Sequence, residues 1–325
     1  MATEHPTVWS GFWPRLIAYV ADTLILGAVC YAVGMVGNDY FAALGSSGRA
    51  FGLGLGTLYF GLTGSGLFGG RSLGMRMLGL KVTGLDGRPL GLPAALGRAL
   101  LLVAPLMLNG WFFPITNPVL TLVIGTVAVT AVFGVCLAQI YLLLFNWPTR
   151  RLVHDLVFGA VVVRADATDI VMPKGRTHAI VAAVWVVVAL GLSLAAPSLL
   201  RSHLPKLAAA VSPLKRVQAA VNALPDVSET SVLDNTSIVA VNGGAATRTR
   251  ILIVKARLTK RPDDPNQALA RIGAATARAY SFSPGQRLEV RIDYGFDLGY
   301  ASYNTYQSSF VSTHCTTPGV TCLEP

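Results

Sequence analysis

Residues 99–149 contain no charged side chain, and neither do residues 50–70 or 179–200. These runs constrain the fold more than any other feature. An uncharged apolar run of about 18 residues or more is long enough to cross a bilayer as a helix. Only 13% of the chain is charged, whereas a typical soluble protein carries about a quarter. The sequence therefore predicts an α-helical multi-pass membrane protein.

Five transmembrane helices account for the apolar runs. The long run at 99–149 is divided in two, because one crossing needs only about 20 residues and NGWFFPITNP at 109–118 favours a turn. Glycine recurs in the second span, so its backbone can approach a neighbouring helix closely; these residues are Gly52, Gly56, Gly61 and Gly64. The expected spans are about 16–37, 50–69, 96–113, 119–146 and 178–197.

Lysine and arginine are concentrated in the short segments 70–98 and 150–176, beside the apolar runs. Short loops rich in these residues mark the cytoplasmic side of a membrane. We therefore expect a cytoplasmic N-terminus, segments 70–95 and 147–177 inside, and everything after the fifth span outside. The net charge is +10, but no basic patch interleaved with aromatic residues stands out. We expect the lipid bilayer as a partner and no nucleic acid.

Asp22 interrupts the first span, in RLIAYVADTLIL. A charge at the centre of a membrane helix costs about 2.5–3.5 kcal/mol, so Asp22 should face the bundle or a wet cavity. Arg15 lies two turns earlier on nearly the same face, with room for a third group between the two side chains. Asp22 is interpreted either as an ion-binding or proton-binding carboxylate or as a polar clamp between helices. The candidates for the third group are Arg150, Arg151, His154 and Asp155.

The ordered set of polar residues over about 9–165 resembles the RDD family of bacterial integral membrane proteins, named for one arginine and two aspartates. The family's glycine-rich loop usually reads Gly-Lys-Arg, whereas here Gly74 is followed by Met75 and Arg76. The resemblance implies a membrane module, sometimes suspected of transport, in a bacterial plasma (inner) membrane. The elements that carry it are Arg15 and Asp22, the segment 70–90, Arg98, and Arg151 with His154 and Asp155.

The loop segment 70–90 turns at Asp86-Gly87. It is interpreted as a flap or re-entrant piece at the bundle mouth, or as an interfacial amphipathic loop whose Arg71, Arg76 and Lys81 touch anionic lipid heads; the second interpretation is preferred. The five histidines are scattered, without metal-ligand or catalytic spacing. Asp155 is expected to pair with Arg15 or Arg151. We expect no enzymatic activity, no cofactor and no metal.

The composition becomes mixed and polar after Pro197. From PLKRVQAAVNAL onward the pattern predicts α-β-β-α-β-β, a small α+β domain with helices on one face of an antiparallel sheet. Its clearest elements are a helix at 264–282 that begins at Asp264 and Pro265, and strands at 249–258 and 286–296. A hairpin turn is expected at Asn242-Gly243-Gly244. The expected organisation is a membrane domain (1–177), a fifth span (178–197) and an extracytoplasmic domain (198–325).

Cysteine usage fits this topology. Cys30 and Cys136 lie within spans and are read as small apolar residues. Cys315 and Cys322 bracket the turn TTPGVT. In an oxidising compartment they should form a disulfide that contributes about 2.5 kcal/mol.

Two functions remain open from the sequence. In the first, the bundle containing Arg15, Asp22 and Asp155 binds or transports a small cation or solute, and transport would favour a homo-oligomer because five spans hold few internal polar residues. In the second, a non-transporting scaffold or sensor anchors an extracytoplasmic domain that binds a protein or envelope partner.

Overall fold

The fold is taken from a computed structural model, which describes residues 8–111, 118–167, 177–199, 204–239, 247–312 and 321–322. The chain forms two compact units, each discontinuous in sequence. We call them the membrane unit and the C-terminal unit. The membrane unit comprises Met1–Ala32, Arg49–Leu199 and Leu298–Ala301, and the C-terminal unit comprises Val33–Gly48, Leu200–Asp297 and Ser302–Pro325.

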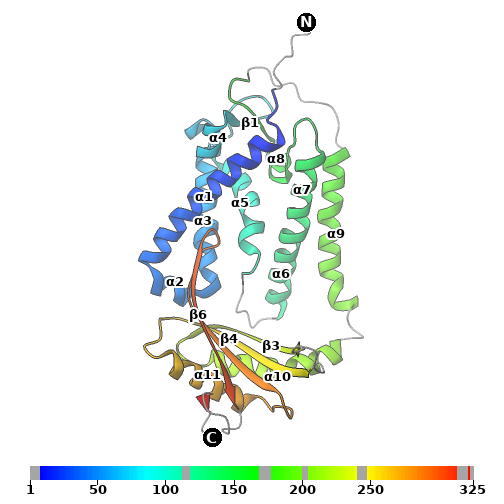
Figure 1. The fold of residues 1–325 in the computed structure, drawn as a ribbon. Coiled ribbons are helices and arrows are strands. Elements are labelled where there is room, and N and C mark those ends of the chain that lie inside the picture. Colours follow the sequence, from blue (N-terminus) through cyan, green and yellow to red (C-terminus); the bar gives the residue numbers. More distant parts are fainter. Residues whose placement is uncertain are drawn as a thin grey trace. The chain divides into compact units, whose positions relative to one another are not determined.

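The membrane unit is built from apolar helices (Figure 1). Among the described residues, three helices are long and apolar enough to cross a membrane: Phe12–Val36, Val123–Phe145 and Thr177–Ala196. The apolar helix Leu92–Leu108 is shorter, so length and composition do not confirm the predicted five spans. The helices of this unit are α1 (Phe12–Val36, of which the part up to Ala32 belongs to this unit), α3 (Arg49–Gly64), α5 (Leu92–Leu108), α6 (Pro118–Val129), α7 (Cys136–Phe145) and α9 (Thr177–Leu199).

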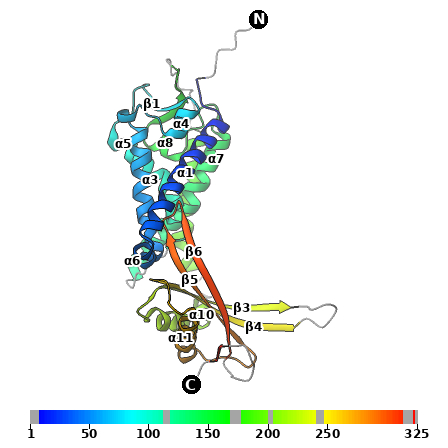
Figure 2. The same cartoon turned by 60° about the vertical axis from the view of Figure 1, so that its left-hand side comes forward.

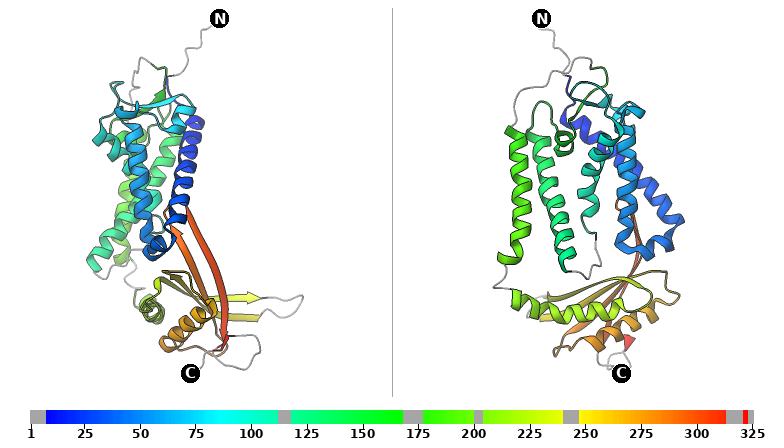
Figure 3. Two further views of the ribbon diagram at one scale, coloured as in Figure 1. Left: turned by 90° about the vertical axis from the view of Figure 1, so that its left-hand side faces the viewer. Right: turned by 180° about the vertical axis from the view of Figure 1, so that it is seen from behind.

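Two of these helices are irregular. A π-helical turn, η3 (Thr130–Val135), joins α6 to α7, so that the three form one continuous rod beside α9 (Figure 3). Gly134 permits this contact, because a Cβ atom there would lie 2.9 Å from Cβ of Ala189. In α5, Pro105 lies inside the helix, where it removes a backbone N–H donor from the helical ladder.

A small α/β cap lies at the end of the bundle where α1 begins (Figure 1). Strands β1 (Leu80–Gly84) and β2 (Ala160–Arg164) pair antiparallel, with Leu80 opposite Arg164. The turn predicted at Asp86-Gly87 is present, since the N–H of Gly87 donates to the carbonyl of Gly84 at 3.1 Å. The other cap elements are η2 (Gly66–Phe68), α4 (Leu73–Met77) and α8 (Val153–Val157).

The C-terminal unit contains the predicted α-β-β-α-β-β order, in α10 (Leu204–Asn222), β3 (Val227–Val239), β4 (Thr247–Leu258), α11 (Pro265–Ala279), β5 (Arg287–Asp297) and β6 (Ser302–Ser312). The expected wholly antiparallel sheet is wrong. The sheet is mixed, in the order β3-β4-β5-β6-β7 (β7 is Thr321–Cys322), and β4 runs parallel to β5. The helix α11 between these two strands provides the crossover that parallel pairing requires. Figure 2 shows the long β3–β4 pair.

Helices α10 and α11 pack on the sheet around a core that includes Val217, Ile272, Leu252 and Val290. Helix α11 begins as predicted: the side chain of Asp264 accepts from the N–H of Asn266 at 2.8 Å. The same unit holds α2 (Asn38–Leu44) and the 3-10 turn η1 (Gly45–Gly48), and Ala42 joins the core.

Cys30 is buried and Cys136 is half-buried, and both are free thiols. Cys315 and the hairpin turn at Asn242-Gly243-Gly244 lie outside the described residues, as does the side chain of Cys322. The Cys315–Cys322 disulfide therefore remains a prediction.

Candidate functional site

Asp22 is held by three hydrogen-bond donors. Its carboxylate is 1% exposed and accepts from the hydroxyl of Tyr59 on α3 at 2.6 Å, the hydroxyl of Ser72 at 2.5 Å and the N–H of Gly74 at 2.8 Å. Ser72 also caps α4, since its oxygen accepts from the N–H of Met75. Asp22 thus fastens the start of α4 to α1 and α3.

Gly74 has a steric reason to be glycine. A Cβ atom at this position would overlap the backbone carbonyl of Ala18 on α1. Only glycine lets the backbone of α4 come close enough for its N–H to reach Asp22. The neighbouring arginines of this loop bind backbone carbonyls, with Arg71 donating to Leu80 and Arg76 to Arg71 and Phe68.

Asp155 is fully buried and lies between two arginines. Its Oδ1 accepts from Nε and Nη2 of Arg98 at 2.8 and 2.7 Å, and its Oδ2 lies 3.6 Å from Nη1 of Arg15. The N–H of Leu152 donates to Oδ2 at 3.2 Å, which closes the first turn of α8. Burial alone would raise the pKa of Asp155, but Arg98 and Arg15 outweigh it and hold this pKa well below its ordinary value.

Arg15 binds the loop that precedes α8. Its guanidinium donates to the carbonyls of Arg150, Thr149 and Val162 at 2.6, 2.9 and 3.0 Å, and to the hydroxyl of Ser10. With Asp155 nearby, this one side chain connects α1 to the end of α7, to α8 and to β2. The arginine is 7% exposed, and a buried guanidinium needs such partners to offset the loss of hydration.

His154 lies beside Asp155 and is almost fully buried. Its Nδ1 is 2.6 Å from Oε1 of Gln139 on α7, and its Nε2 is 3.5 Å from Oδ1 of Asp155. Burial, reinforced by the positive charges of Arg98 and Arg15, lowers the pKa of His154 to about 3, although Asp155 raises it. The imidazole is therefore neutral at physiological pH.

These contacts differ from the arrangement expected from the sequence. We expected one group to bridge Arg15 and Asp22, but each binds a different loop: Arg15 the segment 149–155, and Asp22 the segment 72–74. Among the described residues, Arg151 donates to the backbone carbonyls of Ala160 and Asp155. The side-chain partners that sequence reasoning missed are Tyr59, Ser72, Arg98 and Gln139. Arg98 was named among the elements of the family resemblance, but its pairing with Asp155 was not predicted.

A cavity of about 350 Å³ opens beside this network within the membrane unit. Its walls are mostly apolar and come from α1, α3, α5, η3 and α7, including Phe60, Leu102 and Cys136. The charged residues gather among its lining: Arg15, Asp22, Arg98, His154 and Asp155. Both helix irregularities also border it, Pro105 from α5 and Val132 from η3. Irregular helical turns inside membrane bundles are frequent at functional sites.

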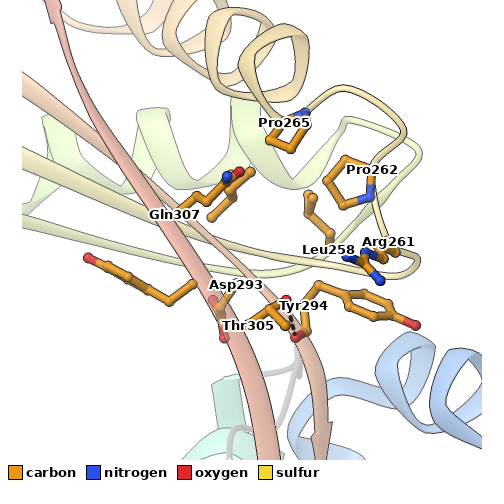
Figure 4. Close-up of a pocket in the computed structure, with 10 residues that line it drawn as sticks. Leu258, Arg261, Pro262, Pro265, Asp293, Tyr294, Thr305 and Gln307 are labelled. Atoms are coloured by element: carbon orange, nitrogen blue, oxygen red, sulfur yellow. Dashed lines mark hydrogen bonds between the residues drawn. The ribbon is translucent and has the colours of Figure 1, made fainter.

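The C-terminal unit has a second cavity, of about 220 Å³, lined by β5, β6 and the segment before α11 (Figure 4). Pro262 and Pro265 border one side of it, and Arg261, Tyr294 and Gln307 are among its polar lining. The hydroxyl of Thr305 donates to the carbonyl of Tyr294 at 3.1 Å. Burial, with a hydrogen bond donated to Asp39, raises the pKa of Tyr294 to about 12.

Apolar helices of spanning length, joined at one end by a buried network of arginine and aspartate, define an integral membrane protein with a polar-ended internal cavity. Residues 9–159 match the RDD family. The chain therefore carries an RDD domain in its N-terminal part, as its sequence motifs indicate. The matched range ends at residue 159, so it does not include residues 200–325. Searches of curated proteins and of solved structures find no match.

Proposed function

We propose that the membrane unit binds a small solute in its apolar cavity, with the polar part of that solute facing the arginine–aspartate network. The observation that supports this is the juxtaposition in one cavity of an apolar wall with Arg98, His154 and Asp155. Ligand sites are typically apolar concavities with a few convergent polar groups. Transport follows if the cavity opens alternately to the two sides of the membrane. In this proposal the protein is not an enzyme.

A solute accounts for the site better than a bare cation. Asp22 already accepts three hydrogen bonds and Asp155 is paired with two arginines. A cation would have to displace these donors from either carboxylate. A solute that carries its own hydrogen-bonding groups needs no such displacement. The contacts of Asp22 fit a polar clamp between helices.

Native mass spectrometry of the purified full-length protein tests the proposal. The wild type should retain a non-covalently bound small molecule. Cys136→Trp should lose it, because Cys136 lines the cavity. The matched control is Leu137→Trp, one residue further along α7, where the side chain is 48% exposed on the helix surface. A bound mass that survives Cys136→Trp, or that is absent from the wild type, would count against binding in this cavity.

Transport and its possible cation cargo need a separate measurement. Proteoliposomes holding the wild type or Asp22→Asn would be given gradients of Na⁺, K⁺ and protons in turn. Normal assembly with lost flux would assign Asp22 to the transported ion. Lost assembly would assign it to the clamp. In this proposal the chain lies in a bacterial plasma membrane with a cytoplasmic N-terminus, and transport would favour a homo-oligomer because the predicted spans hold few internal polar residues.

The second cavity favours an alternative function, in which the C-terminal unit recognises an extracytoplasmic protein or envelope component. Tyr306 lines this cavity and is 52% exposed. A photo-crosslinking amino acid placed at Tyr306 should capture such a partner in cells. The same group at Phe310, which is 50% exposed on β6 but does not line the cavity, should not. Equal capture at both positions would remove this support.

A further inference from the structure

The turn Leu298–Ala301, which follows β5 and precedes β6, belongs to the membrane unit. Leu298 is fully buried there, and its N–H donates to the carbonyl of Ala301 at 2.9 Å. Gly299 supports the tight turn with a φ of +82°, a conformation that glycine adopts without steric cost. The turn Leu298–Ala301 thus completes a unit whose other residues all lie within the first 199 positions of the sequence.

Glycines on two helices make room for this turn. A Cβ atom at Gly52 on α3 would overlap the carbonyl oxygen of Leu298, and one at Gly56 would overlap the hydroxyl of Tyr300. On α1, a Cβ atom at Gly27 would lie 3.3 Å from the carbonyl oxygen of Tyr300. The glycines of α3 were expected to receive a neighbouring helix. Gly61 does so, since it faces Leu96 of α5.

Tyr300 also supports the cavity wall. It packs in one apolar cluster with Tyr19, Phe60 and Leu102, and those three side chains line the cavity. The hydroxyl of Tyr300 is buried without a hydrogen-bond partner among the described residues, so the ring is the part of this side chain that makes favourable contacts. The turn therefore reaches the cavity through packed side chains.

We propose that the glycine groove of α1 and α3, formed by Gly27, Gly52 and Gly56, is a docking site for the turn Leu298–Ala301. Docking holds Tyr300 against the cavity wall and narrows access to the cavity, and release of the turn widens that access. The inference rests on the proposed function in that it concerns the regulation of the same cavity. Its test needs no solute, because Cys136 in the wall reports access directly.

The test measures how fast N-ethylmaleimide alkylates Cys136 in the full-length protein, with peptide mass spectrometry separating Cys136 from the other thiols. Gly52→Ala should raise this rate several-fold, because the overlap involves a backbone carbonyl that cannot rotate away. Gly54→Ala is the matched control on the same helix, since nothing lies within 4 Å of a Cβ atom there. It should react like the wild type.

A second pair of variants tests Tyr300 itself. Tyr300→Ala should raise the alkylation rate as Gly52→Ala does, and Tyr300→Phe should restore the wild-type rate because it keeps the ring. If Tyr300→Ala does not fold, Tyr300→Leu replaces it and should give an intermediate rate. Unchanged reactivity of Cys136 in folded Gly52→Ala and Tyr300→Ala would overturn the inference. Altered reactivity without any bound solute would leave this inference standing and remove the proposed function.

Discussion

Asp155 combines complete burial with two arginine partners. Asp155→Asn should therefore destabilise the membrane unit by about 3–5 kcal/mol, because removing one member of a buried ion pair leaves the other charges uncompensated. Chemical unfolding of the purified protein measures the loss. Asp166→Asn is the control, since Asp166 pairs with Arg164 at the surface and such pairs contribute about 0–1 kcal/mol. Equal losses of stability in the two variants would show that the buried ion pair contributes no more than the surface pair.

His154 gives the stability a pH dependence of known sign. In the unfolded chain it binds a proton as the pH falls below 6.5, whereas in the folded chain its pKa is about 3. The unfolded state therefore holds more protons between these values, and stability should fall by up to about 1.4 kcal/mol per pH unit on acidification. His154→Gln should remove this slope between pH 6.5 and about 3. If stability falls with pH at the same slope in the wild type and in His154→Gln, then His154 is not the cause.

At the scale of elements, α4 depends on one close approach of two backbones. Gly74→Ala should displace α4 from α1, since the new methyl group would overlap the carbonyl of Ala18, and overpacking of this kind costs about 1–3 kcal/mol. Limited trypsin digestion should then cut faster at Arg76. Gly91→Ala, where a Cβ atom meets nothing within 4 Å, should leave the cutting rate unchanged. Equal rates of cleavage at Arg76 in both variants would show that α4 does not require the close approach to α1.

The sequence predicts elements better than it predicts their partners. Uncharged runs located the membrane helices, and alternation located β5, because both depend on local patterns. The predicted count of five spans is not confirmed, because α3 and α5, with 16 and 17 residues, are shorter than the usual spanning length of about 20 residues. The sheet was expected to be antiparallel because local pattern does not reveal which strands a crossover helix brings together.

The sequence predicted one pair of the candidate site, Asp155 with Arg15, but not the partners of Asp22. Arg15, Asp22 and Asp155 all line one cavity. The partners of Asp22 include uncharged groups, the hydroxyl of Tyr59 and the backbone N–H of Gly74. A pattern of charges along the sequence does not identify such partners. Pairing of this kind depends on how helices pack, and packing is not encoded in the spacing of one segment.

At the scale of the whole molecule, the predicted disulfide provides a test of the membrane topology. If residues 198–325 face an oxidising compartment, Cys315 and Cys322 should resist alkylation in protein isolated without reductant, and both should react after reduction. Cys30 and Cys136, which are free thiols, provide the internal comparison in the same peptide map. Two reactive thiols at 315 and 322 before reduction would argue against the bridge and against the outside location together.

The sequence discontinuity of the membrane unit has a consequence for biosynthesis. Residues 298–301 leave the ribosome long after α9, the last helix of this unit, yet they occupy its glycine groove. The helices must therefore insert into the membrane before the turn is synthesised, and the groove stays empty until the turn binds. Ending translation at Leu199 would yield a bundle that has all its helices but lacks the residues that fill its glycine groove.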